Sequence, residues 1–374
     1  MIKRFLSNPD ALLKEGKVLI IYGARRVGKT TLVKEWLKNT TLKSLLVSGD
    51  NIRIRAILSS EDFELINEFV ARYDLVVVDE AQQVPQIGKG LKIIVDENPK
   101  IKVVATGSSS FDLSQQVGEP LTGRKRTVRL FPIAQKELIQ HLNRYELKER
   151  LEEYLVFGSY PEVLLCETKK EKIRVLTELV ESYLLTDILS FERLKNPDQL
   201  FKLLKLLAFQ VGNLVSLNEL GSQLSMNVRT VRRYIDLLEK SFIIYHLGSY
   251  SSNLRKEIAK KNKYYFYDNG IRNAVILQMN ALSDRSDAGA LWENFVMAER
   301  IKKLHYEEVF YNRFFWRNYN GREIDLLEEK NGKLKAFEFK WKKTKTGIPN
   351  DFVKKYGNTG FEIIHPGNYL DFVL

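Results

Sequence analysis

The sequence of 374 residues contains a single cysteine, Cys166. One thiol cannot form a disulfide within the chain, and it cannot supply a zinc site that needs several cysteines. A low cysteine content is typical of proteins that work in a reducing compartment. The composition therefore favours a cytoplasmic location.

Long apolar segments are also absent. No run approaches the ~18 to 20 apolar residues that a membrane-spanning helix needs. The first ten residues carry two basic side chains but no sustained apolar core, so they do not fit the pattern of a signal peptide. We therefore expect no membrane partner.

Acidic residues are the minority among the charged ones. The chain has 47 Asp and Glu against 59 Lys and Arg, which gives a formal net charge of +12. This excess favours a polyanionic partner such as DNA, although many basic proteins bind none. The length allows two or three domains, each with its own apolar core.

The most specific motif is the segment Gly-Ala-Arg-Arg-Val-Gly-Lys-Thr at 23–30, a complete G-x-x-x-x-G-K-T loop. An apolar strand pattern precedes it at 17–22, and a helical pattern follows at 31–38. This order predicts a site for the phosphates of ATP, bound by backbone N–H groups and Lys29, with the Thr30 hydroxyl on magnesium. The nucleotide-binding residues expected here are Gly23, Arg26, Gly28, Lys29, Thr30 and Thr31.

A second motif is the segment 73–80, in which four apolar residues, 75–78, are followed by Asp79 and Glu80. A strand with this ending is a Walker B strand. Asp79 would hold the magnesium ion through its water shell, and Glu80 would orient or deprotonate the attacking water. The two motifs together predict ATP hydrolysis.

Two further positions are candidates for catalysis. Ser108 lies in a hydroxyl-rich turn after the apolar segment 101–106, where it could sense the γ-phosphate or simply cap the turn. Arg124 could neutralise transition-state charge, either in its own chain or in the next subunit of a homo-oligomer. A solvated basic loop is an equally good interpretation of the segment 121–126.

Strand and helix patterns alternate through the first third of the chain. This alternation predicts an α/β fold with a parallel sheet and helices on both faces. From about residue 134 to 207 the sequence predicts only helices. The strands are expected at 17–22, 44–48, 74–79 and 101–106, and the helices include 61–73 and 88–97.

Residues 199–250 have the pattern of helices followed by strands. The helix expected at 228–240 has apolar residues on its inner face and arginines on the opposite one. A basic hairpin that ends at Lys263 follows. These are the elements of a winged helix, whose second helix can enter the major groove of DNA. The alternative is a protein-binding or packing module; the residues expected to contact DNA are Arg229, Arg232 and Arg233.

The C-terminal quarter carries the elements of a D…E-x-K pattern. Asp325 and Glu338 could share a divalent metal, with Lys340 beside it to stabilise developing phosphate charge. Glu293, on an upstream helix, could complete the acidic cluster. The strand expected at 334–341 has aromatic residues on its other face. Acid and lysine alternate on many strands, so the pattern by itself is weak.

These motifs together resemble a group of bacterial and archaeal P-loop ATPases of the AAA type. Further marks of the resemblance are the Gly-Ser-Tyr-Pro segment at 158–161 and the Trp-Glu-Asn-Phe segment at 292–295. The resemblance implies ATP and magnesium at the P-loop and a nuclease-like metal site at Glu293, Asp325, Glu338 and Lys340. It also implies four regions: an ATP-binding domain (1–131), a helical linker or lid region (132–198), a winged helix (199–270) and an α/β restriction-endonuclease-like domain (285–374).

The leading hypothesis from the sequence is a magnesium-dependent ATPase that acts on DNA or is regulated by DNA. The second is an ATP-gated, metal-dependent nuclease. The third is a nucleotide-dependent switch that binds a protein partner.

Overall fold

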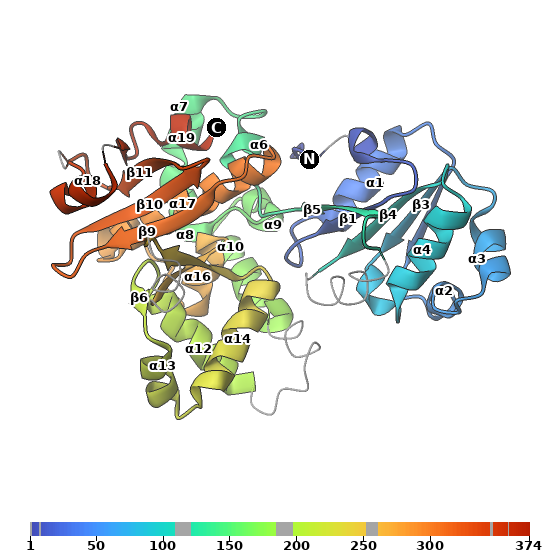
Figure 1. Cartoon of the computed structure of the whole chain (residues 1–374), viewed down its shortest axis with the longest axis horizontal. Coiled ribbons are helices and arrows are strands. Elements are labelled where there is room, and N and C mark those ends of the chain that lie inside the picture. Colours follow the sequence, from blue (N-terminus) through green and yellow to red (C-terminus); the bar gives the residue numbers. More distant parts are fainter. Residues whose placement is uncertain are drawn as a thin grey trace. The chain divides into compact units, whose positions relative to one another are not determined.

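The chain divides into two compact units (Figure 1). The first consists mainly of Met1–Pro132, and the second of most of the chain from Ile133 onward. The computed structural model describes residues 2–6, 9–108, 121–184, 197–251, 261–344, 347–357 and 359–374. The P-loop and Walker B motifs both lie in the first unit.

The first unit is a five-stranded parallel sheet with the strand order β2-β3-β4-β1-β5. The predicted α/β fold with a parallel sheet is therefore confirmed. The strands are β1 (Val18–Tyr22), β2 (Ser44–Ser48), β3 (Leu75–Asp79), β4 (Lys102–Gly107) and β5 (Lys125–Arg129). The helices are η1 (Pro9–Leu12), α1 (Lys29–Asn39), α2 (Ile52–Leu58), α3 (Phe63–Val70), η2 (Ala81–Gln83) and α4 (Ile87–Glu97).

Both faces of this sheet are buried, because successive side chains of a strand point to opposite sides. On one face, Ile20 of β1 shares an apolar core with Ile66 of α3 and Leu91 of α4. The next residue, Ile21, is equally buried and points to the opposite side. Figure 1 shows α1 and α4 on opposite sides of the strands. Strands with a continuous apolar sequence, such as β1 and β3, are typical of a parallel sheet that has helices on both faces.

Two elements of the first unit differ from the sequence expectation. The basic segment after Arg124 forms β5, which is an edge strand paired only with β1. Because an edge strand needs less apolar surface, its sequence Lys-Arg-Thr-Val-Arg carries no clear strand pattern. The helix α2 is also additional to the expected elements. It buries only Leu58, and Asn51 caps its first turn by accepting a hydrogen bond from the N–H of Arg53.

The second unit begins with helices, as the sequence predicts. Pro161 starts α9, at a position where its missing N–H costs no hydrogen bond. None of the described helices is long and apolar enough to cross a bilayer. The first helices are α6 (Gln135–Leu138), α7 (Arg144–Glu149), α8 (Leu151–Phe157), α9 (Pro161–Leu165), α10 (Lys169–Glu178), the π-helix η3 (Leu179–Leu184), α12 (Pro197–Phe209), α13 (Leu217–Leu224) and α14 (Val228–Lys240).

A seven-stranded mixed sheet crosses the second unit in the order β12-β11-β10-β9-β7-β8-β6. Its strands are β6 (Leu214–Val215), β7 (Ile244–Ser249), β8 (Asn262–Phe266), β9 (Asn312–Arg317), β10 (Glu323–Lys330), β11 (Lys333–Phe339) and β12 (Gly360–Ile364). The remaining helices are α16 (Asn269–Val275), η4 (Leu282–Asp284), α17 (Ala288–Tyr306), α18 (Asn350–Tyr356) and α19 (Tyr369–Val373).

The strands that follow α14 belong to the same sheet as the C-terminal strands. The parallel pair β7 and β9 joins them, with Gly248 opposite Phe314 and Ser249 opposite Phe315. The sequence predicts separate domains at 199–270 and 285–374, and this division stays a prediction; most of the first range and all of the second belong to the second unit. A pairing between residues so far apart in the sequence leaves no local pattern.

The strand β11 is covered on both faces. Ala336 belongs to an apolar core with Ile324 and Phe352, while the ring of Phe337 packs on Phe372 of α19. Both Ala336 and Phe337 are buried. Glu338 and Lys340 therefore stand at the end of an internal strand, and Asp325 lies near the start of its neighbour β10.

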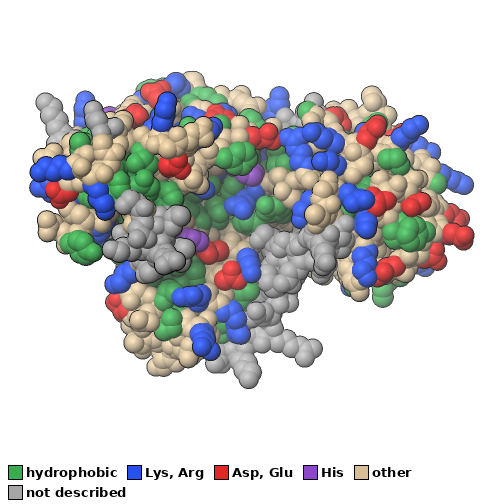
Figure 2. All heavy atoms as spheres, viewed as in Figure 1, with side chains coloured by type: hydrophobic (Ala, Val, Ile, Leu, Met, Phe, Trp, Pro, Cys, Tyr) green, Lys and Arg blue, Asp and Glu red, His purple; other side chains and the backbone are tan. Residues whose placement is uncertain are grey.

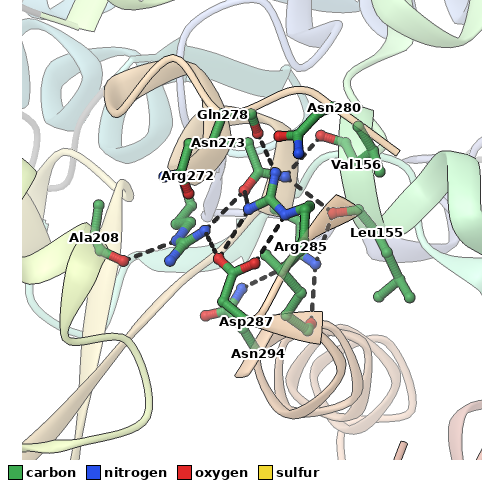
Figure 3. Close-up of polar contacts among 12 residues, drawn as sticks. Leu155, Val156, Ala208, Arg272, Asn273, Gln278, Asn280, Arg285, Asp287 and Asn294 are labelled. Atoms are coloured by element: carbon green, nitrogen blue, oxygen red, sulfur yellow. Dashed lines mark hydrogen bonds and ion pairs between the residues drawn. The ribbon is translucent and has the colours of Figure 1, made fainter. Parts of the chain in front are cut away.

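A buried polar network holds the start of α17 (Figure 3). Arg272 of α16 and Arg285 both donate to Asp287, the residue before α17. Arg272 also donates to the carbonyl of Ala208 in α12. Burial alone would raise the pKa of Asp287, but the two arginines outweigh burial and hold that pKa below its usual value. The network fastens α12, α16 and α17 together.

Candidate functional site

The glycine-rich loop lies at the carboxyl edge of the first sheet, between β1 and α1. Gly28, the residue before α1, has a φ of 95°, which a residue with a side chain adopts only with strain. A Cβ atom on Gly23 would stand 2.0 Å from the carbonyl oxygen of Leu130. Both glycines of the motif are therefore required by the backbone path.

Lys29 lies over this loop. Its side chain is buried, and its Nζ donates to the carbonyl oxygens of Gly23 at 2.9 Å and Ala24 at 3.0 Å. The ammonium group is thus held against the loop whose N–H groups are expected to bind phosphate. The neighbouring Arg26 has a φ of 60° and is half-buried, whereas Thr31 is exposed on α1.

The P-loop and the Walker B strand meet directly. The hydroxyl of Thr30 donates to Oδ2 of Asp79 at 2.8 Å, and the hydroxyl of Thr106 donates to Oδ1 of the same carboxylate. The parallel strands β1, β3 and β4 bring these residues together because their carboxyl ends share one edge of the sheet. A hydroxyl and a carboxylate are the oxygen ligands that Mg²⁺ prefers, so Thr30 and Asp79 fit a magnesium site.

Glu80 and Ser108 are joined by Gln82. The amide of Gln82 donates to the carboxylate of Glu80 and, at 3.2 Å, to the hydroxyl of Ser108. Glu80 has a positive φ of 50°, and its N–H donates to Thr106 Oγ1 at 3.2 Å. The two predicted residues therefore belong to one hydrogen-bonded chain. Gln82 lies just after the Walker B acids and Thr106 ends the apolar segment 101–106, but the sequence pattern predicts no role for either residue.

Arg124 lies away from this site within its own chain. Its carbonyl oxygen accepts a hydrogen bond from Val18, the first residue of β1, whereas the P-loop follows the last residue of that strand. The two ends of this five-residue strand are about 13 Å apart. The side chain of Arg124 forms an ion pair with Asp96 of α4. This position favours a role for Arg124 in another subunit over one in its own chain, and its catalytic role stays a prediction.

Arg4 is a site residue that sequence reasoning missed. Its guanidinium group is buried and donates to the carbonyl oxygens of Val27 and Phe131, both at 2.6 Å. Val27 is part of the P-loop, so the hydrogen bond from Arg4 to its carbonyl oxygen holds the loop in place. No sequence motif includes Arg4, because the contact joins residues that are distant along the chain.

The three arginines predicted to contact DNA are exposed on α14. Arg229, Arg232 and Arg233 stand opposite the buried residues Val231 and Leu238 of the same helix. Lys and Arg side chains gather over α14 on the face drawn in Figure 2. Most of the predicted basic hairpin lies outside the described residues. Its last residue, Lys263, is buried instead of facing solvent.

The predicted nuclease-like residues come together, but each has a protein partner. Oδ2 of Asp325 accepts a hydrogen bond from the N–H of Phe339 at 2.8 Å, and Oε1 of Glu338 accepts one from Lys340 at 2.6 Å. Oε1 of Glu293 accepts one from the Tyr265 hydroxyl at 2.7 Å. Among the described residues, no three His, Cys, Asp or Glu side chains are arranged to hold a metal ion.

The electrostatics of this acidic cluster follow from burial. Burial and the neighbouring charge of Glu293 raise the pKa of Asp325 to about 7. Burial and the charge of Asp325 raise the pKa of Glu338 as well. Both carboxyl groups are therefore harder to ionise here than in water.

Three family models match parts of the chain. Residues 15–139 match an AAA domain, a range that contains all five strands of the first sheet. Residues 148–283 match one domain of unknown function (DUF8612), and residues 288–363 match another (DUF4143).

Several proteins described as uncharacterized are similar over most of the chain. A protein of Haemophilus influenzae is 25% identical over 336 residues, covering 84% of this chain and 80% of the relative. A protein of Mycobacterium tuberculosis is 24% identical over 331 residues and covers 88% and 71%. A protein of Methanocaldococcus jannaschii is 24% identical over 383 residues and covers 93% and 84%.

Solved structures with detectable similarity include a Walker-type ATPase of Pyrococcus abyssi. Its TM-score is 0.48 at 16% identity, covering 69% of this chain and 91% of that one. The replication initiator DnaA, bound to AMPPCP and single-stranded DNA, has a TM-score of 0.29 at 16% identity and covers 60% and 82%. The match to an AAA domain and the geometry of the P-loop site together support nucleotide binding and hydrolysis by the first unit.

Proposed function

We propose that this chain is a magnesium-dependent ATPase whose second unit binds DNA through a winged helix. The observation that carries the ATPase proposal is the hydrogen bond from Thr30 to Asp79 beside the buried Lys29. It unites the P-loop and the Walker B strand in one site. The match of residues 15–139 to an AAA domain supports the same function.

The roles of the residues follow from their chemistry. Lys29 and the loop N–H groups bind the β- and γ-phosphates, and Thr30 and Asp79 hold magnesium. A magnesium ion held there would supply positive charge to neutralise the phosphates. Glu80 orients the attacking water and accepts its proton. Gln82 links Glu80 to Ser108, which we assign to sensing the γ-phosphate.

Two variants test the ATPase proposal by separating nucleotide binding from hydrolysis. Lys29→Ala should lose ATP binding, because it removes the cation that meets the phosphates. Glu80→Gln should retain ATP binding while turnover falls by about 10²- to 10⁴-fold, because an amide cannot accept the proton of the attacking water. Equilibrium ATP binding and steady-state turnover are measured on the full chain. Turnover like that of the wild type in both variants would refute the site.

The DNA proposal is carried by the exposed arginines of α14, a helix whose opposite face is buried. A helix that follows a short turn after α13 and precedes antiparallel strands suits the major groove. The formal net charge of +12 favours the same kind of partner.

Replacing Arg229, Arg232 and Arg233 with alanine should weaken binding to duplex DNA and reduce its salt dependence. Each lost phosphate contact lowers the slope of log K against log salt by about 1. A matched control replaces Lys169, Lys170 and Arg174, which are exposed on α10 and carry the same total charge. If both triple variants lose the same amount of DNA affinity, the affinity depends on the net charge of the chain and not on contacts made by α14.

A further inference from the structure

A buried lysine lies inside the acidic cluster of the second unit. The side chain of Lys263, in β8, is only 2% exposed. Its Nζ lies 3.3 Å from Oε1 of Glu293 and forms another ion pair with Glu323. Glu293 belongs to α17, and Glu323 begins β10, two residues before Asp325. The ammonium group therefore stands among carboxylates from two other elements.

A cation at this position compensates for the buried negative charge. Carboxylates that are removed from water need a positive partner, and a divalent metal supplies it in metal-dependent nucleases. Burial alone would lower the pKa of Lys263, but the charges of Glu293, Glu323 and Asp325 outweigh burial and hold that pKa above its usual value. Lys263 is therefore positively charged at neutral pH.

The candidate metal ligands do not fit a divalent ion. One oxygen of each carboxylate already accepts a hydrogen bond from a protein donor, and no three acidic, His or Cys side chains among the described residues are arranged to hold a metal ion. An ammonium group can pair with these carboxylates, because it needs a few nearby oxygen atoms but no strict coordination geometry. The arrangement thus suits a lysine better than Mg²⁺ or Mn²⁺.

We propose that the ammonium group of Lys263 takes the place of a divalent cation in this cluster. The second unit then folds without metal and does not cleave DNA by metal-ion catalysis. Because Lys263 comes from β8 and the carboxylates come from α17 and β10, the cluster also fastens the strands after α14 to the C-terminal strands. This inference is independent of the ATPase proposal.

The wild-type chain gives the first test. Nucleotide-free full-length protein is titrated with Mn²⁺, and free Mn²⁺ is measured by electron paramagnetic resonance. We expect wild type and Asp325→Asn to bind Mn²⁺ equally weakly. The melting temperature of the wild type should be the same with a chelator as with Mn²⁺. A site of one Mn²⁺ per chain in the wild type that Asp325→Asn abolishes would overturn the proposal, as would Asp325-dependent cleavage of plasmid DNA with Mn²⁺.

The lysine itself gives the second test. Lys263→Met removes the cation but keeps most of the side-chain volume, so the melting temperature should fall by roughly 10 °C. Added Mn²⁺ should restore part of the loss by binding one ion per chain. The double variant Lys263→Met, Asp325→Asn should lose that ion. A folded Lys263→Met protein that binds no Mn²⁺ would contradict the proposal.

A matched control comes from another buried lysine of the same unit. Lys302 is also 2% exposed and pairs with Glu299. Lys302→Met should lower stability without creating an Mn²⁺ site that depends on Asp325. If it creates the same site, the effect of Lys263→Met is a general consequence of lost charge and the proposal is wrong. If neither methionine variant folds, the comparison of wild type with Asp325→Asn still decides.

Discussion

At the scale of single residues, the phosphate site depends on side chains that no motif assigns to it. Thr106 donates to Asp79 and accepts a hydrogen bond from the backbone of Glu80, so one hydroxyl holds both acids of the Walker B strand. Gln82 holds the carboxylate of Glu80, and Arg4 holds the P-loop. These residues act through their neighbours, and they are positioning residues.

Gln82→Leu should lower kcat for ATP hydrolysis by about 10- to 100-fold, because Glu80 loses the donor that orients its carboxylate. KM for ATP should change little, since the Gln82 amide donates to Glu80 and Ser108, neither of which belongs to the P-loop. Steady-state kinetics measure both constants. The exposed neighbour Gln83 provides the control Gln83→Leu, which should behave as the wild type. A change in KM alone would contradict the positioning role.

Arg4→Ala should raise KM for ATP by about tenfold, with a smaller effect on kcat. The change leaves the buried carbonyl oxygens of Val27 and Phe131 without this donor, at a cost of about 1–3 kcal/mol each. The P-loop is then held less firmly before ATP binds. ATP saturation curves and thermal denaturation report the two effects. Lys3→Ala removes the same charge from an exposed neighbour and should change neither.

At the scale of elements, a polar contact joins α14 to β7. Nδ1 of His246 lies 2.6 Å from Oε1 of Glu239, the penultimate residue of α14. The hydrogen bond to Glu239 raises the pKa of His246 despite partial burial. The contact therefore fixes the helix that carries the predicted DNA-binding arginines to the sheet.

This contact predicts a stability that depends on pH. His246 has a higher pKa in the folded chain than in the unfolded one, so its contribution is complete below about pH 6.5, the unfolded value. It is lost as the pH rises through the folded pKa. Glu239→Gln should therefore lower the melting temperature more at about pH 6 than at pH 8.5. The pair is half-exposed, so we expect less than about 1 kcal/mol.

Thermal denaturation at several pH values checks this prediction. In the background of His246→Gln, the same Glu239→Gln change should have no pH-dependent effect in this range. A destabilisation that is equal at both pH values would show that the two residues interact without proton uptake.

At the scale of the whole molecule, Arg124 and the P-loop occupy opposite edges of the first sheet. An arginine that assists hydrolysis from this position must reach the site of a neighbouring subunit. ATPase activity would then require a homo-oligomer.

Arg124→Ala should leave the turnover of a monomeric preparation within about twofold of wild type. The reason is that Arg124 and the P-loop of the same chain are separated by the length of a strand, about 13 Å, which is too far for its side chain to reach the phosphates. In an oligomer, a mixture of Arg124→Ala with Lys29→Ala should be more active than either variant by itself, since each supplies what the other lacks. Sedimentation fixes the oligomeric state during the assay. A large loss of turnover in a monomeric Arg124→Ala protein would contradict the position of this residue.

Most of the first unit could be predicted from local patterns. Buried parallel strands leave apolar runs such as 18–22 and 75–78, and the P-loop glycines mark the turn between β1 and α1. The edge strand β5 and the helix α2 were missed because each buries little apolar surface. In the second unit, the helices were predicted, but the common sheet was not, since the pairing of β7 with β9 is a long-range contact.

The sequence by itself determined the α/β class, the P-loop and Walker B residues and the exposed face of α14, because each depends on spacing within a few residues. Only the tertiary structure decided which groups meet: Thr30 with Asp79, Arg4 with Val27, and Lys263 with Glu293. It also separated Arg124 from the site of its own chain. Contacts between distant segments are set by burial and strand pairing across the whole chain, and these leave no periodic signal in the sequence.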